Sequence, residues 1–159
     1  NIVANEFRNR YWPDAEKILI APQGIAFNPY IKQREKIRAD IRAELGLAKN
    51  TSIVIGCGYG DTRKGIDLFI QMAGHVSRLL AYKGIAFIWV GSVDASFLIY
   101  IQADIKKLGL EHSLHITGYV QLAARYYMAA DIFALTSRED PFPSVVMEAF
   151  DAGLPVVAF

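Results

Sequence analysis

The feature that most constrains the fold of this chain is the regular alternation of short apolar runs with longer amphipathic runs. The expected strands are Lys17–Pro22, Thr51–Gly58, Ile85–Ser92, Ser113–Val120, Asp131–Ser137 and Pro155–Phe159. The expected helices are Gln33–Leu47, one within Lys64–Gly84, Ala95–Leu110, Leu122–Ala130 and Ser144–Gly153. Strands that alternate with helices of crossover length are typical of parallel βαβ units. We therefore predict an α/β fold with a Rossmann-like, doubly wound parallel sheet.

The composition is that of a folded domain. The chain has 159 residues and is 53% hydrophobic, which is enough for a real core and excludes disorder. Its net charge of +1 gives no electrostatic reason to expect binding to nucleic acid or attraction to an anionic membrane. One cysteine, Cys57, cannot form an internal disulfide and favours a reducing, cytoplasmic setting. No apolar run reaches the length of a membrane span.

The two ends of the chain suggest a piece of a longer protein. The sequence starts at Asn1 without an initiator Met and stops directly after an expected strand. Residues 1–16 are polar and aromatic and do not follow the alternation. We expect residues 1–16 to be a linker or an edge segment from a preceding domain, and residues 17–159 to form the α/β domain.

The segment Thr136–Phe159 holds the strongest functional signal. Asp140 precedes an expected helix and Glu148 lies inside it, with two prolines and a serine between them. A helix N-terminus presents free N–H groups and a positive dipole end to anions such as phosphate. Carboxylates beside it can accept hydrogen bonds from sugar or ribose hydroxyls, so the segment predicts a site for a phosphorylated, polyhydroxylated ligand. The alternative is that Asp140 is an N-cap and Glu148 an exposed helix residue.

A second candidate is the glycine-rich loop Gly56–Gly65, which follows a strand and leads into a helix. Its spacing matches neither the dinucleotide fingerprint nor the P-loop. It does deliver Arg63 and Lys64 to the start of a helix, whereas cations are favoured at the opposite end. Two cations there indicate an anion between them and the backbone. An ordinary solvated turn remains the alternative.

Other side chains give weak signals. The histidines and Cys57 lack the spacing of metal ligands, so we expect no metal site. We expect His115 to be a satisfied structural group within a strand. We also expect four aromatic residues to lie in the core: Phe87, Trp89, Phe97 and Tyr100.

Several strings together resemble the C-terminal half of the retaining glycosyltransferases of family 4, which have the GT-B fold. They are "RKGIDLFI", "FIWVGS", "LHITGYV" and "YYMAADIFALTSREDPFPSVVMEAFDAGLPVVAF". The last resembles the E-x7-E signature of that family, and "ILIAPQGIAFNPY" resembles the start of its donor domain. The resemblance implies the donor-binding half of an enzyme that moves a sugar from a nucleotide diphosphate sugar to an acceptor with retention. Synthesis of glycans or of cell-envelope polysaccharide is the implied setting.

The resemblance also implies roles for single residues. Lys64, with Arg63 beside it, would bind the donor diphosphate; Asp140 would contact the transferred sugar, and Glu148 the ribose hydroxyls. The remaining implied donor-binding residues are Phe142, Ser144, Val145, Gly118, Tyr119, Val120, Gly58 and Gly91. The sequence departs from the family where Asp140 replaces a Glu, where Pro141 and Pro143 replace glycines, and where Tyr59 replaces an arginine.

From this resemblance we expect no metal and no cofactor, with the nucleotide sugar as substrate. The expected partner is an N-terminal domain that carries the acceptor site, so the isolated chain should be inactive. The expected location is the cytoplasm, including the inner face of the membrane through peripheral association, and no nucleic acid is expected. Two alternatives remain open: a GT-B enzyme of another reaction type, such as a nucleotide-sugar epimerase or a phosphorylase-like enzyme, and a non-catalytic nucleotide-sugar-binding module.

Overall fold

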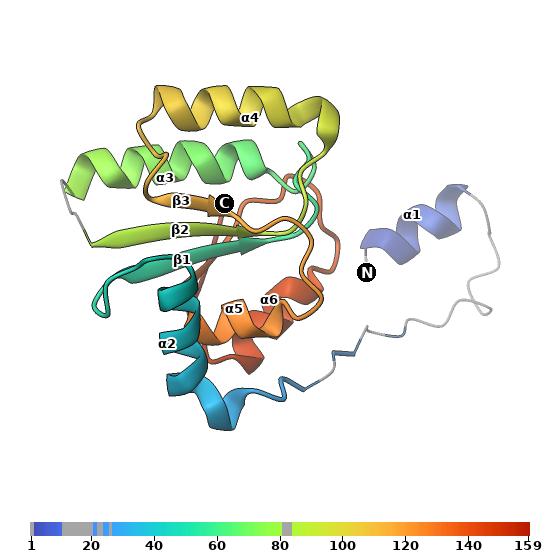
Figure 1. The fold of residues 1–159 in the computed structure, drawn as a ribbon. Coiled ribbons are helices and arrows are strands. Elements are labelled where there is room, and N and C mark those ends of the chain that lie inside the picture. The colour runs from blue at the N-terminus through green and yellow to red at the C-terminus, as the bar shows by residue number, and fades with distance from the viewer. Residues whose placement is uncertain (1, 11–20, 22–23, 26, 81–83) are drawn as a thin grey trace.

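A five-stranded, fully parallel sheet forms the centre of the molecule (Figure 1). The computed structural model describes residues 2–10, 21, 24–25, 27–80 and 84–159. Its strands are β1 (Ser52–Cys57), β2 (Ile85–Val90), β3 (Leu114–Ile116), β4 (Ile132–Leu135) and β5 (Val156–Ala158). Their order in the sheet is β3-β2-β1-β4-β5. The predicted α/β fold with a Rossmann-like, doubly wound sheet is therefore confirmed.

Helices cover both faces of this sheet (Figure 1). One face is covered by α3 (Ile66–Leu80) and α4 (Ala95–Lys107), and the other by α2 (Arg34–Glu44), α5 (Ala124–Ala129) and α6 (Ser144–Asp151). A short 3-10 turn, η2 (Ile31–Gln33), precedes α2, and α1 (Ile2–Arg10) lies near the N-terminus. Each of the five expected helices forms within its predicted range.

The strands are shorter than the apolar runs that predicted them. The run Ser113–Val120 yields only the three residues of β3, because the backbone leaves the sheet and turns at Gly118, where φ is 69°. The predicted strand Lys17–Pro22 lies, except for Ala21, outside the described residues. Within the expected segment 1–16, residues 2–10 form α1.

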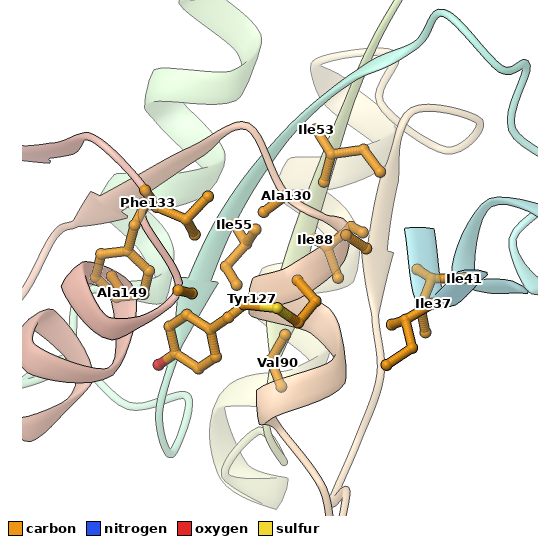
Figure 2. Close-up of a cluster of buried hydrophobic side chains, with 14 of the residues drawn as sticks. Ile37, Ile41, Ile53, Ile55, Ile88, Val90, Tyr127, Ala130, Phe133 and Ala149 are labelled. Carbon is orange, nitrogen blue, oxygen red and sulfur yellow. The ribbon is translucent and has the colours of Figure 1, made fainter. Parts of the chain in front are cut away.

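The core has one layer on each face of the sheet. Ile53, Ile55 and Ile88 face α2 and α5, as Figure 2 shows for the labelled side chains. On the other face, Phe69 and Trp89 meet edge to face with ring centroids 5.4 Å apart. Strands β1 and β2 are thus buried on both sides, as their nearly continuous apolar sequences predict.

The expectation that four aromatic residues lie in the core is confirmed for three of them. Phe87 and Trp89 are buried and Phe97 packs against their cluster, but Tyr100 is 65% exposed. Phe97 and Ile101, four residues apart, face the sheet and turn Tyr100 toward solvent. His115 lies in β3, as expected, but it is not a fully satisfied group, because its Nε2 has no hydrogen-bond partner among the described atoms. Burial lowers the pKa of this imidazole, which favours its neutral form.

A polar network ties α2 to the amino ends of β1 and β4. The Asp131 carboxylate accepts a hydrogen bond from the Ile53 amide at 2.8 Å and forms ion pairs with Arg38 and Arg42. Arg42 is only 5% exposed and also donates to the carbonyl oxygen of Thr51 at 2.9 Å. This network stabilises the sheet at the end opposite the carboxyl ends of the strands.

Candidate functional site

The order of the strands places a crevice between the loops that follow β1 and β4. β2 and then β3 lie on one side of β1 in the sheet, and β4 and then β5 lie on its other side. Parallel sheets bind ligands outside the carboxyl ends of their strands, where the order reverses. The two loops at that point are residues 58–65 and 136–143, and these are the loops in which the sequence predicted charged site residues.

Glycines allow the loops at this edge to lie in backbone contact. Gly65 has a φ of 71°, and a Cβ there would lie 1.9 Å from the carbonyl oxygen of Thr136. Gly91 has a φ of 140°, and a Cβ there would lie 2.1 Å from the carbonyl oxygen of Gly58. That oxygen also accepts a hydrogen bond from Trp89 Nε1 at 3.1 Å. The loops after β1, β2 and β4 are therefore held together by contacts that a side chain would block.

The basic loop and the acidic loop meet through an ion pair. Lys64 Nζ donates a hydrogen bond to Asp140 Oδ2, and the two side chains are only 15% and 11% exposed. Asp140 is therefore not the N-cap of α6; that position is Pro143, which makes no side-chain capping bond. Lys64 also needs no external anion, contrary to expectation, because a carboxylate of the chain itself compensates its charge.

Two arginines that flank this ion pair connect the same loops. Arg63 is exposed and donates to the carbonyl oxygen of Glu139 at 3.3 Å. Arg138 donates to the carbonyl oxygen of Thr62 at 2.7 Å and to both carboxylate oxygens of Asp67, at 2.8 and 2.7 Å. These hydrogen bonds hold the pKa of Asp67 below its ordinary value. Sequence reasoning missed Arg138 and Asp67, because their pairing joins residues 71 positions apart.

Glu148 lies in α6 and is half-buried, so the alternative that it is an exposed helix residue is wrong. Its charge acts on Cys57, the last residue of β1. Burial raises the pKa of the Cys57 thiol to about 11, and the charges of Glu148 and Lys64 act on it in opposite directions. Cys57 is therefore a neutral thiol that lies within electrostatic reach of both predicted site residues.

The other predicted site residues lie around an open cleft, in the first turn of α6 and in the loop before α6. Gly58, Gly91, Tyr119 and Val120 line an open cleft of about 260 Å³ beside Cys57. Gly118 pairs with Gly91 through an isolated bridge at the edge of this cleft.

Ser144 and Val145 form the first turn of α6 and are half-buried, whereas Phe142 in the preceding loop is 45% exposed. Glu148 lines a separate cavity of about 270 Å³ together with Tyr127 and Asp151. Sequence reasoning missed Tyr127, whose position in a short apolar helix predicts only a core residue.

No group of three or more His, Cys, Asp or Glu side chains in the described part of the chain could hold a metal ion. None of its helices combines the length and the apolar character that a membrane span needs.

The doubly wound sheet has glycine-rich and charged loops at its switch point, and a helix without a side-chain cap follows one of them, so the domain is Rossmann-like. Residues 37–159 match the family described as glycosyl transferases group 1. The chain belongs to this family.

Relatives of the chain are glycosyltransferases. The D-inositol 3-phosphate glycosyltransferase of Segniliparus rotundus is 30% identical over 161 residues, which span 99% of this chain and 35% of the relative. The crystal structure of Anabaena Alr3699/HepE in complex with UDP and glucose is 26% identical with a TM-score of 0.67, over 77% of this chain and 33% of that one.

The structure of WaaG, a glycosyltransferase involved in lipopolysaccharide biosynthesis, matches with a TM-score of 0.80 and 24% identity, over 97% of this chain and 41% of that one. This likeness agrees with the expected fold, in which the chain forms one half of a GT-B enzyme. The chain spans about a third of the length of the curated relatives it matches.

Proposed function

We propose that this chain is the donor-binding half of a retaining glycosyltransferase of family 4. The enzyme would transfer a sugar from a nucleotide diphosphate sugar to an acceptor in glycan or cell-envelope polysaccharide synthesis. Membership of the glycosyl transferases group 1 family supports this proposal, as does the Anabaena relative that holds UDP and glucose. The observation that carries it is the Lys64–Asp140 pair, which gathers a cation and a carboxylate at the switch point of the sheet.

Each proposed role comes from the resemblance to the family and is compatible with the position of the residue. The cleft lined by Gly58, Gly91, Tyr119 and Val120 would take the nucleobase, with Gly118 at its edge. Glu148, half-buried on α6, would accept hydrogen bonds from the ribose hydroxyls. The donor phosphates and sugar would face the first turn of α6 and the loop before it, which contain Phe142, Ser144 and Val145.

The chemistry needs stabilisation of the leaving diphosphate. As the bond between the anomeric carbon and the phosphate oxygen breaks, its electron pair goes to the diphosphate and positive charge develops on the sugar. Preorganised positive groups lower the energy of such a transition state because they need no reorganisation. Lys64, Arg63 and the uncapped N-terminus of α6 are the groups proposed for this role, without a metal ion or a covalent nucleophile.

Asp140 would serve two purposes in this arrangement. Its Oδ2 accepts from Lys64 and so fixes the ammonium group at the carboxyl edge of the sheet. Its Oδ1 would then accept a hydrogen bond from a hydroxyl of the transferred sugar. An Asp is one methylene shorter than the Glu usual in the family, and the ion pair with Lys64 anchors it at the crevice.

We further propose that residues 17–159 form the donor domain and that residues 1–16 belong to the connection with an N-terminal domain. That domain would carry the acceptor site, so the isolated chain would bind the donor weakly and catalyse nothing. The proposed location of the enzyme is the cytoplasm, including the inner face of the membrane.

The proposal is tested by calorimetric titration of the protein with UDP, GDP and ADP, repeated with the variant Glu148→Ala. One nucleotide should bind, and Glu148→Ala should weaken it, whereas the matched control Glu111→Ala on an exposed turn should not. If neither this chain nor the full-length protein binds any of the three nucleotides, the proposal is wrong. Product analysis with a labelled donor then separates transfer to an acceptor from the epimerase and phosphorylase alternatives.

A further inference from the structure

The hydroxyl group of Tyr127 is a buried polar atom that no described residue meets with a hydrogen bond of regular geometry. Tyr127 is only 1% exposed, and its hydroxyl forms no hydrogen bond of regular geometry among the described atoms, although Cys57 and Glu148 lie close enough to interact with it. Buried polar side chains nearly always have a partner, so an unpaired one needs an explanation. One such explanation is that a bound ligand rearranges a neighbouring group. The hydrogen bond of the Tyr127 hydroxyl then reaches regular geometry only in the bound state.

The aromatic ring fixes the direction in which this hydroxyl points. It stacks on Phe133 with ring centroids 5.6 Å apart and an angle of 17° between the planes. The rest of the ring is enclosed by the core cluster, and in Figure 2 its hydroxyl oxygen points away from Ile55 and Ile88. The phenol therefore cannot rotate toward a new partner without a cost in packing energy, so the partner group has to move toward the hydroxyl.

Glu148 is the acceptor that faces this hydroxyl. Tyr127 and Glu148 line the same cavity of about 270 Å³, between α5 and α6. A second carboxylate in that lining, Asp151, accepts a hydrogen bond from the Asn28 amide at 2.6 Å and, unlike Glu148, is not among the groups that act on the Tyr127 hydroxyl. The thiol of Cys57 is also near, but a neutral sulfur is a weaker acceptor than a carboxylate. Burial raises the pKa of Tyr127, and the charges of Cys57 and Glu148 and their hydrogen-bonding interactions with the hydroxyl raise it further, so the hydroxyl keeps its proton and can donate.

We propose that Tyr127 is a positioning residue for Glu148, whose carboxylate receives a hydrogen bond from the Tyr127 hydroxyl when the ribose of a nucleotide binds. A glutamate side chain has three rotatable bonds, and a fixed donor behind it selects one orientation. A carboxylate has about four acceptor sites, enough for two ribose hydroxyls and one phenol. This inference rests on the proposed function, because it assigns the ribose contact to Glu148.

The test is calorimetry on the full-length protein with Tyr127→Phe, using the best-binding nucleoside diphosphate and its 2′,3′-dideoxy analogue. Tyr127→Phe should weaken the ribonucleotide by about tenfold and leave the dideoxy analogue unchanged. Tyr126→Phe is the matched control: it removes a phenol from the same helix that faces Glu44 and Arg125 instead, and it should change neither affinity. In a Glu148→Ala background, Tyr127→Phe should cause no further loss.

The outcomes separate the two proposals. Equal losses for both nucleotides would mean that Tyr127 acts only through packing and would overturn the inference, as would unchanged ribonucleotide binding or a further loss in the Glu148→Ala background. If the wild-type protein binds no nucleoside diphosphate at all, the proposed function fails and the inference falls with it. Tyr127→Phe keeps the ring that packs on Phe133, and its melting temperature should match that of the wild type.

Discussion

The ion pair at the crevice makes a quantitative prediction about stability. Lys64 and Asp140 have side chains that are only 15% and 11% exposed, so removal of either partner leaves a nearly buried charge uncompensated. Lys64→Met should cost about 3 kcal/mol in the free energy of unfolding, at the low end for a broken buried pair because some water still reaches it. Asp140→Asn should cost about 2 kcal/mol, since a lysine can extend its flexible stem toward solvent.

The double variant should be much less unstable than the two single effects predict. With both charges gone, no uncompensated charge remains, so the coupling energy of the cycle should be about 2 kcal/mol. The chain offers a matched control in the same two loops. Arg138 and Asp67 also pair, but their side chains are 42% and 26% exposed, so the cycle Arg138→Met with Asp67→Asn should show a much smaller coupling.

Urea unfolding measures both cycles, with the fluorescence of Trp89 as a signal because this side chain is 2% exposed next to the site. Raising the salt concentration from about 0.1 M to about 1 M should abolish the coupling of the exposed pair and leave most of the coupling of the buried pair. Additive effects of Lys64→Met and Asp140→Asn, or a coupling no larger than in the control, would refute the reasoning.

Three further predictions concern the scaffold of the site. Gly65→Ala should destabilise the protein by at least about 2 kcal/mol in urea unfolding, because its Cβ would lie 1.9 Å from a carbonyl oxygen, whereas Gly109→Ala, with a similar φ and open space, should cost about 1 kcal/mol. Asp131→Ala should cost about 3 kcal/mol in the same assay, because it leaves a β1 amide and the buried Arg42 without their carboxylate, and a cost near zero would contradict the network. The hydrogen bonds that Asp67 accepts lower its pKa in the folded state, so on acidification the unfolded state binds this proton first. The stability that this carboxylate contributes is therefore fully present above about pH 4 and is lost as the pH falls further. Asp67→Asn should remove that part of the acid dependence, and an unchanged pH profile of stability would show that the pair does not form.

The elements of the fold could be predicted because they depend on local periodicity. The spacing of Ile37, Ile41 and Leu45 is typical of a helix such as α2, and the nearly unbroken apolar run at Ile85 is typical of a strand buried on both faces. The order of the strands could not be read in this way, because it depends on which distant segments pair. The ends of the strands were also misjudged. The apolar run after Ser113 continues past the point where Gly118 turns the chain out of the sheet.

The candidate site could be predicted as two loops but not as one arrangement. Residue types and strand positions identified Lys64, Asp140 and Glu148 separately, and the topology rule placed their loops at the same edge. The ion pair between Lys64 and Asp140 joins residues 76 positions apart, and no local pattern records such a contact. Tyr127 had no signal at all, because a hydroxyl without a partner can be recognised only when its surroundings are known.

The ion pair changes the electrostatic picture of the proposed donor site. Sequence reasoning took Arg63 and Lys64 as two free cations that await a phosphate, but in the structure Asp140 already compensates Lys64 and Asp67 compensates Arg138. Among the described residues of the two loops, Arg63 is the cation that has no carboxylate partner and contacts only a carbonyl oxygen. An incoming diphosphate would therefore meet one uncompensated arginine, the uncapped end of α6 and a lysine that is held in place by its own counter-ion. Such a site attracts the diphosphate less strongly through its net charge than two free cations would. It stabilises the transition state more through preorganisation, because Lys64 is fixed at the carboxyl edge of the sheet before any ligand binds.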